Sequence, residues 1–333
     1  MSLLYIYESG SKLGVREHRF CVEYPDKHIR EIPIESIDSI TVAGNAQLTA
    51  QCVKTCLNKG IAVSFFSKGG NYFGRLMSTG HVNTGRQRLQ CELYQSDFAV
   101  GLAKRIIMAK IRNQIVVLRR YAKSREKDVT EFASEMERCR NKTAACASAE
   151  EMMGNEGYAA RVYFRGLAEV IDASFKFSGR SRRPPKDEFN SMINLGYSVL
   201  RNIVYSMIES KGMNPYFGFL HQDKEQHPTL ASDLMEEWRA VLVDSTVLSL
   251  INGHEIQKEH FVFEQESDAC FLSKDGMRIL LSKLEAKLQT KMKYLTRIPH
   301  PVSFRQAISL QIDALVHAME ERNASVYEPI EVR

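Results

Sequence analysis

Three short stretches of this 333-residue chain carry side chains that can act on phosphate esters. The first holds Glu156 between glycines, the second places His221 after an apolar run, and the third has three acids within Ser232–Trp238. Carboxylate oxygens are the ligands that Mg²⁺ prefers, and one added imidazole shifts the preference toward Mn²⁺. A divalent ion neutralises charge on a transferring phosphoryl group and activates water or a 3′-hydroxyl. One interpretation is therefore a metal site for phosphodiester chemistry.

Each stretch also has a purely structural interpretation, which spacing alone leaves open. Glu156 fits an early-helix acid that the helix dipole favours. A single histidine such as His221 is more often hydrogen-bonded in a surface or core than bound to a metal. The three acids of the third stretch fit the first turn of a helix capped by Ser232.

The acids of the third stretch separate when they are placed on a helix. At about 100° per residue, one apolar face is formed by Leu234, Trp238, Val241 and Leu242. Glu236 lies almost opposite this face, Glu237 lies near its margin and Asp233 lies between the two. Glu236 is therefore the best candidate to reach a polar cleft, and Asp233 suits the helix start or the orientation of water. Glu237 is the poorest ligand candidate, and the change Glu237→Gln is predicted to be nearly silent.

Basic residues gather in two groups. Residues 104–127 contain nine Lys or Arg against one acid, and Arg105, Arg112 and Arg119 recur every seven residues. On a helix these three arginines drift by only about 20° per heptad. A row of positive charges repels itself, and binding to phosphates with release of their counterions relieves this repulsion. The alternative is a solvated helix face, but two basic groups in one helical region favour binding to nucleic acid. The second group comprises Arg161, Arg165, Lys176, Arg180, Arg182, Arg183 and Lys186.

The elements that must position these residues divide the chain in two. Short strand-like runs fill the first part, at 3–7, 20–24, 29–34, 37–42, 61–66 and 71–77, with one helix near 47–59 and a Gly-rich turn at 67–70. Helical spacing then dominates at 98–123, 155–178, 188–211, 231–250, 274–292 and 303–322, with a strand-like pair at 261–263 and 271–272. We predict an α+β protein: a β-rich domain at 1–85, a linker near 78–88 and a larger all-α domain at 86–333. Residues 125–150 are polar and are expected to mix helix and loop.

Bulk properties restrict the class of protein. Hydrophobic residues at 44% and charged residues at 26% are typical of a water-soluble globular chain. No apolar run is long enough for a transmembrane helix, and the N-terminus lacks the pattern of a secretion signal. Seven cysteines without a CxxC pair favour reduced thiols in a cytoplasm over disulfides or zinc. The net charge of +5 does not identify a partner.

The three stretches, in this order, resemble the CRISPR-associated adaptation integrases, the first-numbered Cas family. In that family a glycine-flanked glutamate, a histidine closing a Gly-Phe-aliphatic-His string and an acid about fifteen residues later form the metal site. The matching positions are Glu156, His221 and Glu236. The stretch Pro184–Tyr197 is also similar to this family. The segment Leu230–Arg239 and the stretch His300–Gln306 resemble its branch with a glutamate as the third ligand.

The resemblance implies a nuclease and integrase in which Glu156, His221 and Glu236 bind Mg²⁺ or Mn²⁺ and Asp233 supports them. It implies a homodimer, two copies of which clamp a dimer of the small second-numbered Cas protein; we assign dimerisation and partner contacts to the β-rich domain. The complex would capture a short DNA duplex, whose 3′-hydroxyl ends attack the CRISPR repeat by transesterification. An isolated subunit would cut DNA and branched junctions.

The expected DNA contacts come from both basic groups: Arg105, Lys110, Arg112, Arg119, Arg161, Arg182 and Arg183. Two other functions stay open. A non-catalytic nucleic-acid-binding protein would keep the basic helices and use the acids only as helix starts. A phosphodiesterase for small nucleotides would not need an arginine row about 20 Å long.

Overall fold

A computed structural model describes residues 2–67, 72–76, 78–80, 82–264, 266–293 and 298–332. The chain divides into two compact units, Met1–Val82 and Asn83–Arg333. The first is rich in strands and the second is mostly helical, so the predicted α+β class is confirmed. None of the described helices is both long enough and apolar enough to cross a membrane.

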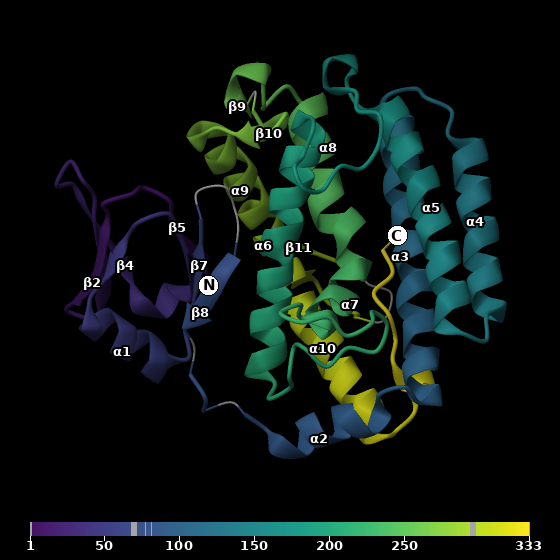
Figure 1. Cartoon of the computed structure of the whole chain (residues 1–333), viewed down its shortest axis with the longest axis horizontal. Coiled ribbons are helices and arrows are strands. Elements are labelled where there is room, and N and C mark those ends of the chain that lie inside the picture. The colour runs from purple at the N-terminus through teal and green to yellow at the C-terminus, as the bar shows by residue number, and fades with distance from the viewer. Residues whose placement is uncertain are drawn as a thin grey trace. The chain divides into compact units, whose positions relative to one another are not determined.

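Two four-stranded sheets form the N-terminal unit (Figure 1). In the first, β1 (Ser2–Ile6), β5 (Ile37–Ala43) and β7 (Ala62–Phe66) run parallel, and β8 (Tyr72–Leu76) pairs antiparallel to β7. The second has the order β4 (Ile29–Pro33), β3 (Arg19–Glu23), β2 (Lys12–Arg16) and β6 (Gln47–Leu48). A core of apolar side chains holds the unit together, and it includes Leu13, Phe20, Ile40 and Val63.

Local sequence explains most of this unit. Phe20 and Val22 are buried in β3 while their neighbours are more exposed, as the alternation predicts. Helix α1 (Ala50–Lys59) begins where the Thr49 side chain accepts the Cys52 N–H, and it ends at Gly60, whose φ of 69° suits glycine. Strand β2 was not predicted, because its five residues are interrupted by Gly14. Residues 68–70 of the predicted Gly-rich turn lie outside the described residues.

The C-terminal unit is built around the long helix α3 (Asp97–Ser124), which packs against α4 (Thr130–Ala145), α5 (Ala149–Val170) and α7 (Thr229–Trp238). Figure 1 shows α3, α4 and α5 as neighbouring columns. Helix α6 (Glu188–Ser210) packs on α7. The remaining larger elements are α2 (Thr84–Leu93), α8 (Ser245–Asn252), α9 (Lys274–Gln289), α10 (Phe304–Glu320) and the strand pair β9 (Phe261–Glu264) with β10 (Ala269–Leu272). A second short pair joins β11 (Lys291–Met292) to β12 (Val302–Ser303).

Several boundaries differ from the sequence predictions. Helix α2 begins inside the predicted linker, because the Asn83 side chain caps it. Helix α4 fills most of the segment expected to mix helix and loop. The helix predicted at 155–178 begins earlier and ends at Val170. The helix predicted at 231–250 contains a π-helical stretch, Arg239–Asp244, between α7 and α8.

Candidate active site

Glu156 and Glu236 both contact a buried lysine, and His221 lies beside Glu236. Lys110 on α3 donates a hydrogen bond from Nζ to Glu156 Oε1 on α5, and the same Nζ lies 2.6 Å from Glu236 Oε2 on α7. His221 belongs to the loop between α6 and α7, and its Nε2 lies 3.8 Å from Glu236 Oε1. Side chains from α3, α5, α7 and the loop before α7 therefore form one cluster.

Glu156 lies in the interior of α5, not at its start. The helix begins at Ala149, about two turns earlier, so the interpretation of Glu156 as an early-helix acid is wrong. A Cβ added at Gly154 or Gly157 would meet no atom within 4 Å. Gly157, the next residue, therefore leaves the helix surface beside Glu156 bare, and the Glu156 side chain is 17% exposed.

Asp233 organises the loop that carries His221. Its carboxylate accepts the N–H groups of Phe219 at 2.7 Å, Leu220 at 3.0 Å and His221 at 3.1 Å. It also lies 2.7 Å from His221 Nδ1, so this ring nitrogen donates to Asp233 and Nε2 faces Glu236. A Cβ at Gly218 would lie 2.7 Å from Asp233 Oδ2 and 2.8 Å from Thr229 Cβ. Only glycine fits this close approach, which explains its place in the string before His221.

The charges of the cluster fix its protonation. Burial alone would lower the pKa of His221, but the hydrogen bond and charge of Asp233 outweigh burial and raise that pKa. Burial would raise the pKa of Glu236, but Arg239, Lys110 and His221 together hold it well below its usual range. Burial opposes the charge of Lys110, yet Glu236 and Glu156 raise its pKa. Glu236 is therefore a carboxylate and Lys110 an ammonium.

Arg239 was not predicted as a site residue. Its Nη2 lies 3.0 Å from Glu236 Oε1, and its guanidinium stacks 5.0 Å from the centre of the Tyr197 ring. The Tyr197 hydroxyl donates to Asp244 at 2.7 Å, and burial raises the pKa of Asp244 to about 6. The available signal was the spacing of three residues from Glu236, which places Arg239 on the same side of the helix.

Glu237 points away from the cluster. It accepts the Tyr327 hydroxyl and the Ile330 N–H, both at 2.6 Å, and its side chain is fully buried. Glu237 is therefore not placed to bind a metal beside Glu236, as the sequence predicts. Because this carboxylate anchors the segment 327–330, we expect Glu237→Gln to lower stability rather than to leave the protein unaffected. The proposed cap at Ser232 is wrong, since α7 begins at Thr229.

The first basic group is not one open phosphate-binding face. Arg105 donates to the Tyr327 carbonyl at 3.3 Å, and Arg112 pairs with Glu331 at 3.0 Å. Lys110 is buried in the cluster, whereas Arg119 is exposed and the Arg112 side chain is 43% exposed beside Glu331. The row fails as a single surface because α3 is the central helix and the segment near Tyr327 lies against it.

The second basic group includes exposed cations close to the elements of the cluster. Arg161 is exposed on α5, the helix of Glu156. Arg182 and Arg183 are exposed in the loop before α6, and side chains of α6 fix that loop. Asn190 Nδ2 donates to the Gly179 carbonyl at 2.8 Å, and Asn194 Nδ2 donates to the Arg182 carbonyl at 2.9 Å. These arginines are therefore presented from ordered backbone.

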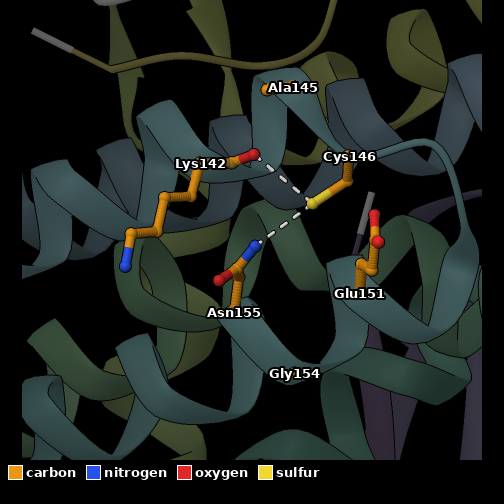
Figure 2. Close-up of a pocket in the computed structure, with 6 residues that line it drawn as sticks. All are labelled: Lys142, Ala145, Cys146, Glu151, Gly154 and Asn155. Atoms are coloured by element: carbon orange, nitrogen blue, oxygen red, sulfur yellow. Dashed lines mark hydrogen bonds between the residues drawn. The ribbon is translucent and has the colours of Figure 1, made fainter.

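A hollow of about 390 Å³ lies where α4 ends and α5 begins, and Figure 2 shows its lining: Lys142, Ala145, Cys146, Glu151, Gly154 and Asn155. The Asn155 amide points at the Cys146 sulfur, at 3.2 Å, while the Lys142 ammonium points away. None of the three predicted metal ligands lines this hollow. It is therefore distinct from the cluster around Lys110.

Within the described ranges, no three His, Cys, Asp or Glu side chains are arranged so that they could hold one metal ion. The physical reason lies in the cluster itself, because the Lys110 ammonium lies between the carboxylates of Glu156 and Glu236. The donor types still match a hard divalent cation. Glu236 Oε2 is buried and already holds a cation beside it, the Lys110 ammonium at 2.6 Å, so this position accommodates positive charge.

Comparison with known proteins gives a consistent result. The family model for CRISPR associated protein Cas1 matches residues 4–286. A CRISPR-associated endonuclease Cas1 of Mycobacterium tuberculosis is 34% identical over 335 residues, covering 100% of this chain and 98% of that protein. A Cas1 protein structure from Thermotoga maritima matches with a TM-score of 0.82 and 25% identity, over 96% of this chain and 97% of that one. A chain of a Cas6-RT-Cas1–Cas2 complex matches with a TM-score of 0.83 and 25% identity, over 100% of this chain and 36% of that longer one.

Proposed function

The chain belongs to the Cas1 family of CRISPR-associated endonucleases, and we propose that it cuts DNA and joins DNA strands with a divalent metal ion during CRISPR spacer acquisition. The observation that carries this proposal is the convergence of Glu156, His221 and Glu236 from three parts of the chain. The relatives' name supports the endonuclease. The strand-joining reaction and the metal are our proposal.

The residues of the cluster fit Mg²⁺ or Mn²⁺. Glu156 and Glu236 offer carboxylate oxygens and His221 offers Nε2, a donor set of hard oxygens with one imidazole. The buried Glu236 Oε2 accommodates positive charge, since the Lys110 ammonium lies 2.6 Å from it, and the bare surface beside Glu156 leaves room for a substrate phosphate. When bound, such an ion would neutralise the transferring phosphoryl group and activate the attacking hydroxyl.

The chain's own residues would orient the metal ligands and hold the DNA. Asp233 fixes the ring of His221 with Nε2 toward the site, and Arg239 holds the other oxygen of Glu236. Exposed arginines would bind the DNA backbone by phosphate contacts; we assign this to Arg161, Arg182 and Arg183. In the joining reaction the 3′-hydroxyl oxygen of one DNA end bonds to a phosphorus of the target strand. The bond to the leaving 3′-oxygen breaks, and its oxygen takes up a proton, so the number of phosphodiester bonds is unchanged.

We also propose partners. One matched structure is of a complex whose title names Cas1 and Cas2, which supports assembly with the small second-numbered Cas protein. We infer that the working unit is a homodimer, and that the β-rich unit, residues 1–82, contributes to dimer and partner contacts. Size measurement of the purified chain, alone and with that partner, tests this assembly.

Metal-dependent cleavage tests the function directly. The purified chain is incubated with a branched DNA junction in Mg²⁺, in Mn²⁺ and in chelator, and a Glu156→Gln variant is the matched control. We expect cutting only with the unchanged protein and metal. DNA binding without any cutting would favour a non-catalytic nucleic-acid-binding protein. Cleavage of small nucleotides but not of DNA would favour the phosphodiesterase.

A further inference from the structure

We propose that Lys110 is an internal cation that occupies the gap between Glu156 and Glu236 and that is displaced when a divalent ion binds there. The inference rests on the metal site proposed above and adds a competitor for it. Lys110 Nζ donates to Glu156 Oε1 and lies 2.6 Å from Glu236 Oε2, and the lysine side chain is only 6% exposed. It therefore bridges α5 and α7 from its place on α3.

The charges balance without any added ion. Glu156 and Glu236 contribute two negative charges, while Lys110 and Arg239 contribute two positive charges. Arg239 contacts Glu236 Oε1, whereas Lys110 contacts Glu236 Oε2, so only the lysine lies between the two glutamates. A divalent ion placed there beside the ammonium would put two cations in contact, where burial weakens the screening of their repulsion. The two cations therefore exclude each other.

The displaced group must be the side chain, because the backbone beneath it is fixed. The neighbours Ala109 and Ile111 are fully buried, and Asn113, one turn later, donates to the Glu237 carbonyl at 2.9 Å and the Ile330 carbonyl at 2.8 Å. Lysine suits this role because its charge is a compact group on a flexible four-carbon stem. Its ammonium can leave the gap by rotating about that stem while α3 stays in place.

Metal affinity measured by calorimetry tests the competition. Mn²⁺ is titrated into the metal-free full chain, unchanged and as Lys110→Met, which keeps the stem and removes the charge. We expect the variant to bind Mn²⁺ at least tenfold more tightly, since no internal cation must be displaced. Its melting temperature without metal should be lower than that of the unchanged protein, and Mn²⁺ should raise it by more. The matched control is Arg112→Met on the same helix, whose partner is Glu331; its Mn²⁺ affinity should not change.

The outcomes separate the two proposals. Equal or weaker Mn²⁺ binding by Lys110→Met would overturn the competition and leave the metal site standing. Absence of binding in every protein would contradict the metal site and the competition together. If Lys110→Met folds only when Mn²⁺ is present, that rescue supports the inference. If it does not fold at all, Lys110→Gln, which keeps hydrogen-bond donors without the charge, gives the deciding affinity.

Discussion

Replacing Asp233 with asparagine removes one of the two oxygens that hold the loop of His221. Oδ2 accepts the N–H groups of Phe219 and Leu220, at 2.7 Å and 3.0 Å. Oδ1 accepts the His221 N–H at 3.1 Å and His221 Nδ1 at 2.7 Å. Asparagine offers one oxygen and one NH₂ group. With the NH₂ group at the Oδ2 position, the Phe219 and Leu220 N–H groups would each face another donor. With it at the Oδ1 position, the His221 N–H would face a donor and the ring would have to move its proton from Nδ1 to Nε2.

The size of the effect follows from these contacts. A hydrogen bond to a charged group contributes about 1.5–3 kcal/mol, so the loss of one or two amounts to about 1.5–6 kcal/mol before the loop relaxes. We expect the free energy of unfolding to fall by about 3 kcal/mol, because relaxation recovers part of this loss. The ring of His221 would also lose its fixed orientation. Loss of such a supporting partner typically weakens metal affinity or activity by about 10–100-fold.

Three measurements on Asp233→Asn check this reasoning: urea unfolding in metal-free buffer, Mn²⁺ affinity by calorimetry, and the rate of DNA cutting. The matched control is Asp313→Asn, the same chemical change in a surface ion pair with Lys211 at 2.6 Å. The control should change stability by less than about 1 kcal/mol. An Asp233→Asn protein with near-normal stability and unchanged Mn²⁺ affinity would refute the role assigned to Asp233.

Three further predictions follow from the site. Glu156→Gln should abolish metal-dependent cutting while DNA affinity, measured by fluorescence anisotropy, stays nearly the same; full residual activity would contradict its role as a ligand. Glu237→Gln should lower the free energy of unfolding by about 2 kcal/mol, since it weakens hydrogen bonds to a buried carboxylate, and an unchanged urea midpoint would contradict this. The triple change of Arg161, Arg182 and Arg183 to alanine should reduce the slope of DNA affinity against salt concentration by up to about 2.7. The control is the double change of Arg105 and Arg112 to alanine, which should leave that slope unchanged because both arginines contact the segment near Tyr327.

The sequence predicted most elements because their signals are local. The alternation around Phe20 predicts β3, and the spacing of apolar residues predicts α3 and α6 close to their observed bounds. Elements with weak local signals were missed. Helix α2 depends on a cap by Asn83, and its outer face is polar. The π-helical stretch after α7 carries no local signal that we recognise.

The prediction from the apolar face of the helix fails at α7. The sequence treats the side opposite the apolar face as open to a polar cleft, but all residues of α7 are buried. Its three acids are therefore inside the protein, and each has a different partner. Glu236 forms an ion pair with Lys110, Asp233 accepts a hydrogen bond from His221, and Glu237 accepts one from Tyr327. The same failure applies to Arg112, which a local charge count places on an open face although Glu331 pairs with it.

The sequence by itself determined the kinds of side chain available for chemistry, the change from strands to helices, and the family to which the chain belongs. Only the tertiary structure decided that Lys110 lies between Glu156 and Glu236, and that Glu237 serves the segment near Ile330. The reason is the distance along the chain. Lys110 and Glu156 are 46 residues apart, and Glu237 and Ile330 are 93 apart. Periodicity reports which face of a helix is apolar, whereas the packing of distant helices determines which charges that face meets.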